Sequence, residues 1–168
     1  MNRRFAISDI HGNYQTFLAA LDHIQLSPND QLYLLGDYVD RGPASRQVIS
    51  YIRRLISEGY QIHCLRGNHE QYMHTALRLE EERYMLHWLR SGGAATMRSY
   101  EDRENGKMVD VLDAHLEWIN QLPFYLKTED YFFVHAGLNF AAVDPLKDLE
   151  SLIQIRRWKE SVDLTWLQ

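Results

Sequence analysis

Short apolar runs alternate with helical patterns through the first half of the chain. Apolar residues are continuous in 5–7 and 32–35 and prevail in 61–65, and each of these segments predicts a strand. Between the runs, apolar side chains recur with the period of an α-helix from Tyr14 to Ile24, behind a potential cap at Asn13. A second helix is predicted from about Pro43 to Gly59, a typical C-terminal cap. This order predicts an α/β fold.

The second half of the chain is richer in helical patterns. Residues 69–121 favour helices that break at 91–93 and again in the polar stretch 101–107. Residues 124–127 and 131–134 predict two strands that a turn joins, and a helical pattern returns after Pro145. Because the chain has no linker, repeat or low-complexity tract, we expect one domain over residues 1–168.

Composition narrows the classes of function. The 168 residues are 45% hydrophobic and carry a net charge of −5, which fits a globular domain and disfavours a nucleic acid polymer as partner. No segment reaches the length of a membrane span, and Ser8 and Asp9 interrupt the N-terminus before a signal peptide could develop. The single cysteine, Cys64, lies in an apolar run and is expected to be a buried strand residue. We therefore expect a cytoplasmic protein that does not bind membranes.

Polar clusters follow the predicted strands. They occupy residues 9–13, 36–42, 66–70 and 135–137. Because ligands of open α/β sheets gather beyond the carboxyl ends of strands, these clusters are expected to converge on one site. Their Asp, His and Asn side chains suit Mn, Fe or Zn, and several carboxylates meeting there would need divalent cations to neutralise them.

Each cluster has an ordinary structural explanation when it is taken alone. Asp9 and His11 would serve as a helix cap or turn, Asp37 as the turn that ends a strand, and Asn68 and His69 as loop residues. The clusters follow successive strands, however, and that joint occurrence favours a functional site over four unrelated turns.

The same residues resemble a known family. The segments Asp9-Ile10-His11-Gly12, 36–42 (GDYVDRG), 67–70 (GNHE) and 135–137 (HAG) resemble the phosphoprotein phosphatase family, the binuclear-metal serine/threonine phosphatases within the calcineurin-like metallophosphoesterases. Residues 91–96 and 122–123 resemble its bacterial and phage branch, and the resemblance extends over about residues 4–158. It implies a sandwich of central β-sheets flanked by helices.

The resemblance also implies a site with two divalent metal ions, Mn being expected and Fe or Zn remaining alternatives. Asp9 and His11 would bind the first metal, Asp37 would bridge both, and Asn68 and His135 would bind the second. Such a pair would activate a water molecule for attack on phosphorus.

Four further residues receive roles from the resemblance. His69 would protonate the leaving oxygen, and Asp40 would orient its imidazole. Arg41 would hold the phosphate oxygens. Arg156 would provide a second phosphate-binding guanidinium, with Arg157 as its rival, although a charged helix face explains both arginines nearly as well.

The chain departs from the family pattern after Arg156. The family has a further histidine in a Gly-His-Thr-type motif, followed by more strands, and no such motif occurs here. We therefore expect a chain truncated at its C-terminal end, with a weaker second metal site. Exposed sheet edges would remain, and a homodimer could cover them.

Three functions remain open from the sequence. The leading one is a metal-dependent phosphatase acting on phosphoserine or phosphothreonine in proteins or on small phosphoesters, which Tyr38 and Glu70 in their motifs favour. The alternative enzyme is a dinucleoside tetraphosphate hydrolase, because related enzymes share the metal motifs. The third is a non-catalytic phosphate-binding remnant, against which the intact His69, Asp40 and Arg41 argue. Residues 101–107 are a candidate rim of the site or a plain solvated loop.

Overall fold

A parallel three-stranded sheet organises the first half of the molecule. The computed structural model describes residues 3–101 and 111–156. Strands β1 (Arg4–Ile7), β2 (Gln31–Leu34) and β3 (Gln61–Cys64) lie in the order β1-β2-β3. Their last residues are in register, Ile7 with Leu34 and Leu34 with Cys64, so the three strands end at the same level. The predicted strands and the convergence of their ends are confirmed.

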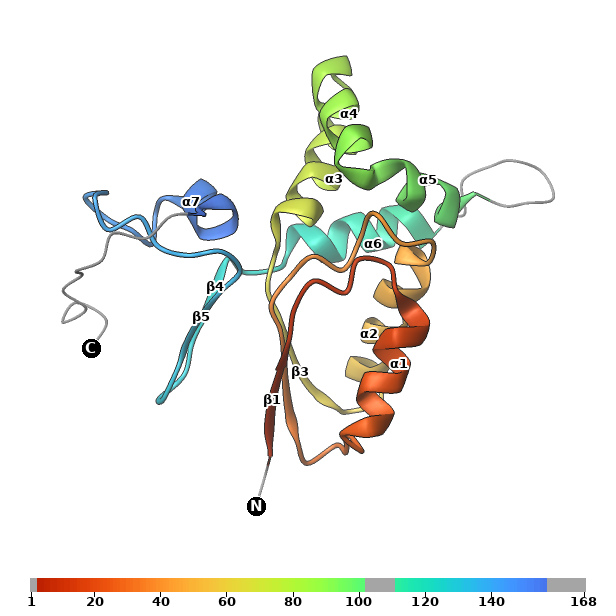
Figure 1. Cartoon of the computed structure of the whole chain (residues 1–168), viewed down its shortest axis with the longest axis vertical. Helices are drawn as coiled ribbons and strands as arrows, with labels where there is room; N and C mark the ends of the chain where they lie inside the picture. Colours follow the sequence, from red (N-terminus) through yellow and green to blue (C-terminus); the bar gives the residue numbers. More distant parts are fainter. Residues whose placement is uncertain (1–2, 102–110, 157–168) are drawn as a thin grey trace.

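Two amphipathic helices cover one face of this sheet (Figure 1). Helix α1 (Tyr14–His23) buries Phe17 and Leu21, and α2 (Ser45–Ser57) buries Val48, Ile49, Ile52 and Leu55. These residues share one helix face because they recur with the helical period. Asn13 occupies the N-cap position of α1, but its side chain donates to the carbonyls of Ile10 and His11 and does not cap the helix as expected.

The helical middle of the chain contains one break that was expected and one that was not. Helix α3 (Asn68–Leu79) ends at Glu80, whose φ of 55° lies in the left-handed region, before α4 (Glu82–Trp88) begins. The expected break at 91–93 is confirmed by Gly92, whose φ of 113° is not helical. It kinks the chain between the π-helical turn (Leu89–Gly93) and α5 (Ala94–Tyr100). Helix α6 (Val111–Asn120) follows, and residues 102–107 of the expected break lie outside the described part of the chain.

A hairpin packs on the other face of the sheet. Strands β4 (Tyr125–Lys127) and β5 (Phe132–Val134) pair antiparallel, as predicted. The ring of Phe133 stacks on that of Tyr33 in β2, with 4.4 Å between the centroids. The short helix α7 (Leu149–Gln154) follows the hairpin and is tied to it by the Ala136 N–H, which donates to the Leu152 carbonyl (2.8 Å). The three-stranded sheet thus has helices on one face and the two-stranded sheet of the hairpin on the other, which agrees with the expected α/β fold (Figure 1).

Two expectations from composition are met by the structure. Cys64 is buried at the end of β3, and burial raises the pKa of its thiol to about 12, so it is an unreactive core residue. Among the described residues, the helices are all too short or too polar to cross a bilayer.

Candidate active site

The loops that follow β1 and β2 are joined by backbone hydrogen bonds. The N–H groups of His11 and Gly12 donate to the carbonyls of Asp37 and Tyr38, both at 2.8 Å. These hydrogen bonds join the two loops beyond the ends of their strands and bring the two polar clusters together. The result is a pocket of about 290 Å³. Its lining includes most of the predicted site residues, namely Asp9, Asp37, Arg41, Asn68, His69, His135 and Arg156, together with Tyr72, Ala136 and residues 153–155.

These two loops hold strained backbone conformations. Five of their non-glycine residues have φ between 46° and 72°, namely Asp9, His11, Asp37, Asp40 and Arg41. The left-handed region is sterically unfavourable for residues with a Cβ, and it persists only where surrounding contacts impose it. All five are predicted site residues, so the strain is concentrated where the candidate chemistry lies.

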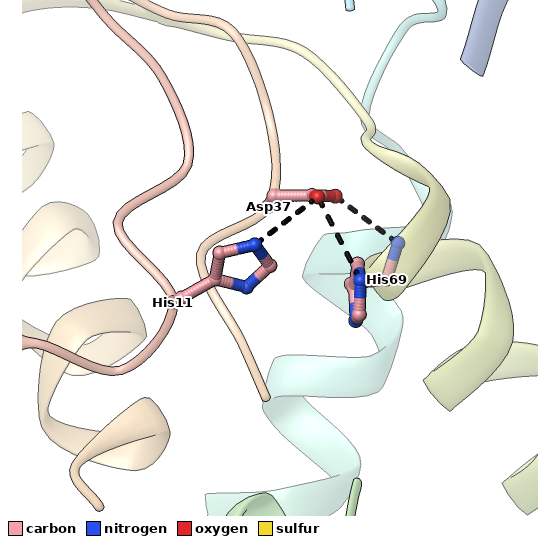
Figure 2. A group of neighbouring side chains, drawn as sticks. All are labelled: His11, Asp37 and His69. Atoms are coloured by element: carbon pink, nitrogen blue, oxygen red, sulfur yellow. Dashed lines mark hydrogen bonds and ion pairs between the residues drawn. The ribbon is translucent and has the colours of Figure 1, made fainter. Parts of the chain in front are cut away.

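Asp37 lies at the centre of the site (Figure 2). Its Oδ2 is 3.5 Å from the Nε2 of His11, and its Oδ1 is 3.5 Å from the Nε2 of His135. The backbone N–H of His69 donates to Oδ1 (3.1 Å), while the Nε2 of His69 is 3.9 Å from Oδ2. Each carboxylate oxygen therefore faces a different imidazole, which is the arrangement expected of a carboxylate that bridges two cations.

The tautomers of His11 and His135 follow from their hydrogen bonds. The Nδ1 of His11 is 2.9 Å from the Val39 carbonyl, and the Nδ1 of His135 is 2.7 Å from the Leu35 carbonyl. A carbonyl only accepts, so both Nδ1 atoms carry the proton and donate. In this tautomer the lone pair is on Nε2, the atom through which each histidine would bind a metal ion, and the Nη1 of Arg41 lies 2.9 Å from the Nε2 of His11.

The other acceptors around Asp37 complete a donor set that fits divalent cations. The Oδ1 of Asn68 lies 3.1 Å from the Nε2 of His135, and the carboxylate of Asp9 lies 3.8 Å from the Nε2 of His11. Imidazole nitrogen, carboxylate oxygen and amide oxygen suit Mn, Fe or Zn, and convergent acceptors of this kind are stabilised by a shared cation. One ligand atom each from His11, Asp37 and His69 also lies within 4.8 Å of the others. The residues present therefore fit a metal centre.

His69 and Asp40 form a buried pair beside this centre. The Nδ1 of His69 donates to the Oδ2 of Asp40 (2.7 Å), so its Nε2 faces the pocket. Burial lowers the pKa of the His69 imidazole, but the hydrogen bond to Asp40 and the charges of Asp37 and Glu70 outweigh it, and the pKa is raised. Asp40 thus fixes the orientation of the imidazole, and the role of His69 as proton donor stays a prediction.

Two residues that the sequence did not assign to the site hold the Asp40 carboxylate. The indole Nε1–H of Trp88 donates to Oδ1 (2.9 Å), and the hydroxyl of Thr96 donates to the same oxygen (2.7 Å). The backbone N–H of Asp40 donates in return to the Thr96 hydroxyl oxygen (2.8 Å) and to Ser45. Trp88 was expected in the core, where it is indeed fully buried. Thr96 lies within the segment 91–96 and Trp88 lies just before it. This segment resembles the bacterial and phage branch of the family, but no role was assigned to its residues from the sequence.

Tyr38 and Glu70 brace the site from behind. The Tyr38 hydroxyl lies 2.9 Å and 2.7 Å from the carbonyls of Leu34 and Leu65, which it faces as donor, and the side chain is fully buried. The Glu70 carboxylate accepts from the backbone N–H groups of residues 37, 38, 39 and 67, at 2.8–3.2 Å. Burial and the charge of Asp37 raise the pKa of Glu70, whereas these N–H donors lower it. Both residues fix the loops and face away from the pocket.

Close approach of the loops requires glycine at two positions. A Cβ on Gly67 would lie 2.3 Å from the Oδ1 of Asp37. A Cβ on Gly36, which has a φ of 101°, would lie 2.6 Å from the backbone nitrogen of Gly67. A side chain at position 67 would displace the Asp37 carboxylate, and one at position 36 would displace the backbone of Gly67.

The two predicted phosphate-binding arginines both line the pocket. Arg41 is exposed, and its Nη1 and Nη2 lie 2.9 Å and 3.2 Å from the Nε2 atoms of His11 and His69. Arg156 follows α7 and lines the same pocket. Its rival Arg157 lies outside the described residues. The predicted residues are thus brought to one place, with His11 and Asp40 immediately behind the lining.

Comparison with known proteins agrees with this arrangement. The family model described as calcineurin-like phosphoesterase matches residues 3–168. The chain is 29% identical to the symmetrical bis(5′-nucleosyl)-tetraphosphatase of Klebsiella pneumoniae (strain 342) over 161 residues, which cover 94% of the chain and 49% of that protein. The enzyme of the same name from Nitrosomonas europaea is 31% identical over 140 residues, covering 80% of the chain and 44% of the relative. The chain spans about half the length of these curated relatives.

Solved structures show the same fold. A serine/threonine protein phosphatase from Saccharomyces cerevisiae superposes with a TM-score of 0.60 at 17% identity, covering 91% of this chain and 51% of that one. A cold-active protein-tyrosine phosphatase from a psychrophilic Shewanella species superposes with a TM-score of 0.58 at 19% identity, covering 84% and 46%. The resemblance seen in the sequence is confirmed for the wider family, while these curated relatives bear the name of the alternative enzyme. Because the family model matches residues 3–168, the chain belongs to the calcineurin-like phosphoesterase family.

Proposed function

We propose that this protein is a metal-dependent hydrolase that cleaves the phosphoanhydride chain of dinucleoside tetraphosphates. The observation that carries the hydrolase proposal is the position of Asp37, whose two oxygens face the imidazoles of His11 and His135 at the same distance of 3.5 Å. The adjacent pair His69–Asp40 supplies a proton donor within the same pocket.

Each side of Asp37 offers one group of ligands. Asp9, His11 and Asp37 would hold one divalent cation, and Asp37, Asn68 and His135 would hold the second. Cations bound there supply Lewis acidity, which lowers the pKa of bound water and neutralises phosphate charge. Mn is our expectation for the resident metal, with Fe or Zn as alternatives, because this donor set suits all three.

The remaining side chains handle protons and phosphate oxygens. His69 would deliver a proton from Nε2 to the leaving phosphate oxygen, since Asp40 holds its Nδ1 and thereby its orientation. Arg41 and Arg156 would bind non-bridging oxygens, because both line the pocket and both are exposed to an entering anion. In the overall reaction, one water adds across a P–O–P bridge, and symmetrical cleavage of a tetraphosphate yields two nucleoside diphosphates.

Two observations favour a dinucleoside tetraphosphate over a phosphoprotein as the substrate: the names of the curated relatives and the burial of Tyr38 and Glu70. The curated relatives described above are named as symmetrical bis(5′-nucleosyl)-tetraphosphatases. The sequence preference for a protein phosphatase depended on Tyr38 and Glu70. Both are fully buried and bonded to backbone groups, so they do not contact a substrate and carry no information about it.

Product analysis tests this proposal directly. The chain is incubated with Mn²⁺ and either diadenosine tetraphosphate, a phosphothreonine peptide or p-nitrophenyl phosphate, and ADP or phosphate is quantified by chromatography. We expect ADP as the main product from the first substrate. His69→Asn is expected to lose activity by a factor of about 100 or more, the range of general acid catalysis. His23→Asn is the matched control, because His23 is an exposed residue at the end of α1.

The other outcomes select the other hypotheses. Faster phosphate release from the peptide than ADP release from the dinucleotide would favour the serine/threonine phosphatase. Folded protein without activity on any of the three substrates would favour a non-catalytic phosphate-binding remnant.

A further inference from the structure

A second cavity adjoins the catalytic pocket. It has a volume of about 390 Å³, within the usual size of small-molecule sites, and lies between α3, α4 and α7. Tyr72 and Gln154 line both cavities, so the two cavities meet at these side chains. The ring centroid of Tyr72 is 5.6 Å from that of His69, which places this second cavity directly beside the proposed proton donor.

The lining of this second cavity is aromatic. Tyr72 and Thr75 are three residues apart on α3, and Tyr84 and His87 are three residues apart on α4, so each pair shares one helix face. The rings of Tyr72 and His87 meet edge to face, with 4.5 Å between centroids, and both tyrosines are half-buried. Packed rings of this kind lose little conformational freedom when a flat ligand stacks on them.

The polar groups of the cavity suit the edges of a heterocycle. The Thr75 hydroxyl and the Gln154 amide provide donors and acceptors, and the guanidinium of Arg83 lies over the Tyr84 ring at 4.5 Å. None of the cavity-lining groups is a carboxylate, whereas Asp9 and Asp37 line the catalytic pocket. One cavity thus carries the groups for phosphate and metal, and its neighbour carries aromatic rings, neutral hydrogen-bonding groups and the guanidinium of Arg83.

We propose that the cavity lined by Tyr72, Tyr84 and His87 binds one nucleobase of the substrate while the adjoining phosphates occupy the catalytic pocket. This inference rests on the proposed function and assigns the base-binding part of the site. Stacking on aromatic side chains contributes affinity for any base, because every base has a π-face. Tyr72, which lines both cavities, stands where the ribose joins the base to the phosphate chain.

Binding of product-like ligands tests the base site without requiring turnover. Calorimetry in the presence of Mn²⁺ compares ADP with methylenediphosphonate, which carries two phosphorus groups but no nucleoside. The ratio of their dissociation constants isolates the contribution of the nucleoside. It is measured for the wild type, for Tyr84→Ala and Tyr84→Phe, and for Tyr131→Ala, a control at a tyrosine that is 55% exposed in the hairpin turn.

We expect ADP to bind more tightly than methylenediphosphonate in the wild type. Tyr84→Ala should reduce this advantage roughly 5- to 150-fold, which corresponds to stacking worth about 1–3 kcal/mol. Tyr84→Phe and Tyr131→Ala should retain it, and methylenediphosphonate should bind all four proteins equally. His87→Ala, a change at an exposed residue, should also reduce the advantage and serves if Tyr84→Ala does not fold.

Two results would overturn the base site. Equal affinity of the wild type for ADP and methylenediphosphonate would exclude a nucleoside contribution, as expected if the cavity accepts an apolar side chain of a phosphopeptide. An ADP advantage that persists in both Tyr84→Ala and His87→Ala would place the base elsewhere. A preference for ADP that depends on Tyr84, in a protein that leaves diadenosine tetraphosphate intact, would support the base site and contradict the proposed reaction.

Discussion

Removing the hydroxyl of Thr96 tests how the pair His69–Asp40 is held in place. Asp40 is fully buried, and donors from three side chains surround its carboxylate: the imidazole of His69, the indole of Trp88 and the hydroxyl of Thr96. Thr96→Val keeps the shape of the side chain and removes one of these donors. The Asp40 N–H also loses an acceptor but keeps Ser45 at 3.1 Å, so its loss adds little.

The magnitude follows from the charge on the acceptor. A hydrogen bond to a buried charged group contributes about 1.5–3 kcal/mol, so Thr96→Val should lower the free energy of unfolding by roughly that amount. Urea denaturation at pH 7, followed by circular dichroism, measures the change. Thr96→Ser retains the hydroxyl and is expected to preserve the bond while losing one buried methyl group, at a cost of about 1 kcal/mol.

Catalysis provides the second readout. If Thr96 positions Asp40 and thereby His69, Thr96→Val should reduce kcat for diadenosine tetraphosphate, whereas Thr96→Ser should largely retain it. A stability change below about 0.5 kcal/mol for Thr96→Val would refute the reasoning, because it would mean that the carboxylate does not depend on this donor.

Two further predictions concern metal and pH. In a thermal melt, Mn²⁺ at about 100 times its Kd should raise Tm by roughly 5–10 °C. Asp37→Asn should lose most of this rise. The control variant Asp113→Asn, at an exposed position on α6, should keep it. Burial, aided by the charges of Arg53 and Arg46, lowers the pKa of His115 to about 4. The unfolded state, with a histidine pKa of about 6.5, binds more protons between these values, so urea denaturation should show stability falling as pH drops from about 6.5 to about 4. His115→Gln should flatten that slope, and an unchanged slope would contradict the assignment to His115.

Strand and helix positions were predictable because they depend on local patterns. The runs that became β1 to β5 and the helical periods of α1 and α2 are properties of neighbouring residues, and the structure reproduces them. The boundary between α3 and α4 was not predictable, since Glu80 adopts a left-handed conformation that nothing in its residue type requires. The break at 91–93 was predictable, because glycine readily adopts the positive φ of 113° that interrupts the helix at Gly92.

The sequence by itself determined which side chains are available for catalysis and that they follow the ends of the strands. Asp, His and Asn directly follow strands of a parallel sheet, and strands in register deliver them to one edge, so Asp9, Asp37 and Asn68 had to be neighbours.

Only the tertiary structure decided how these residues are held and what lies beside them. Trp88 and Thr96 reach Asp40 across 48 and 56 residues of chain, and Tyr72 and Gln154 of α7 line both cavities. Such contacts depend on how helices pack against one another and on where each side chain points. No periodicity in the chain encodes those angles, and they fix both the proton donor and the proposed base site.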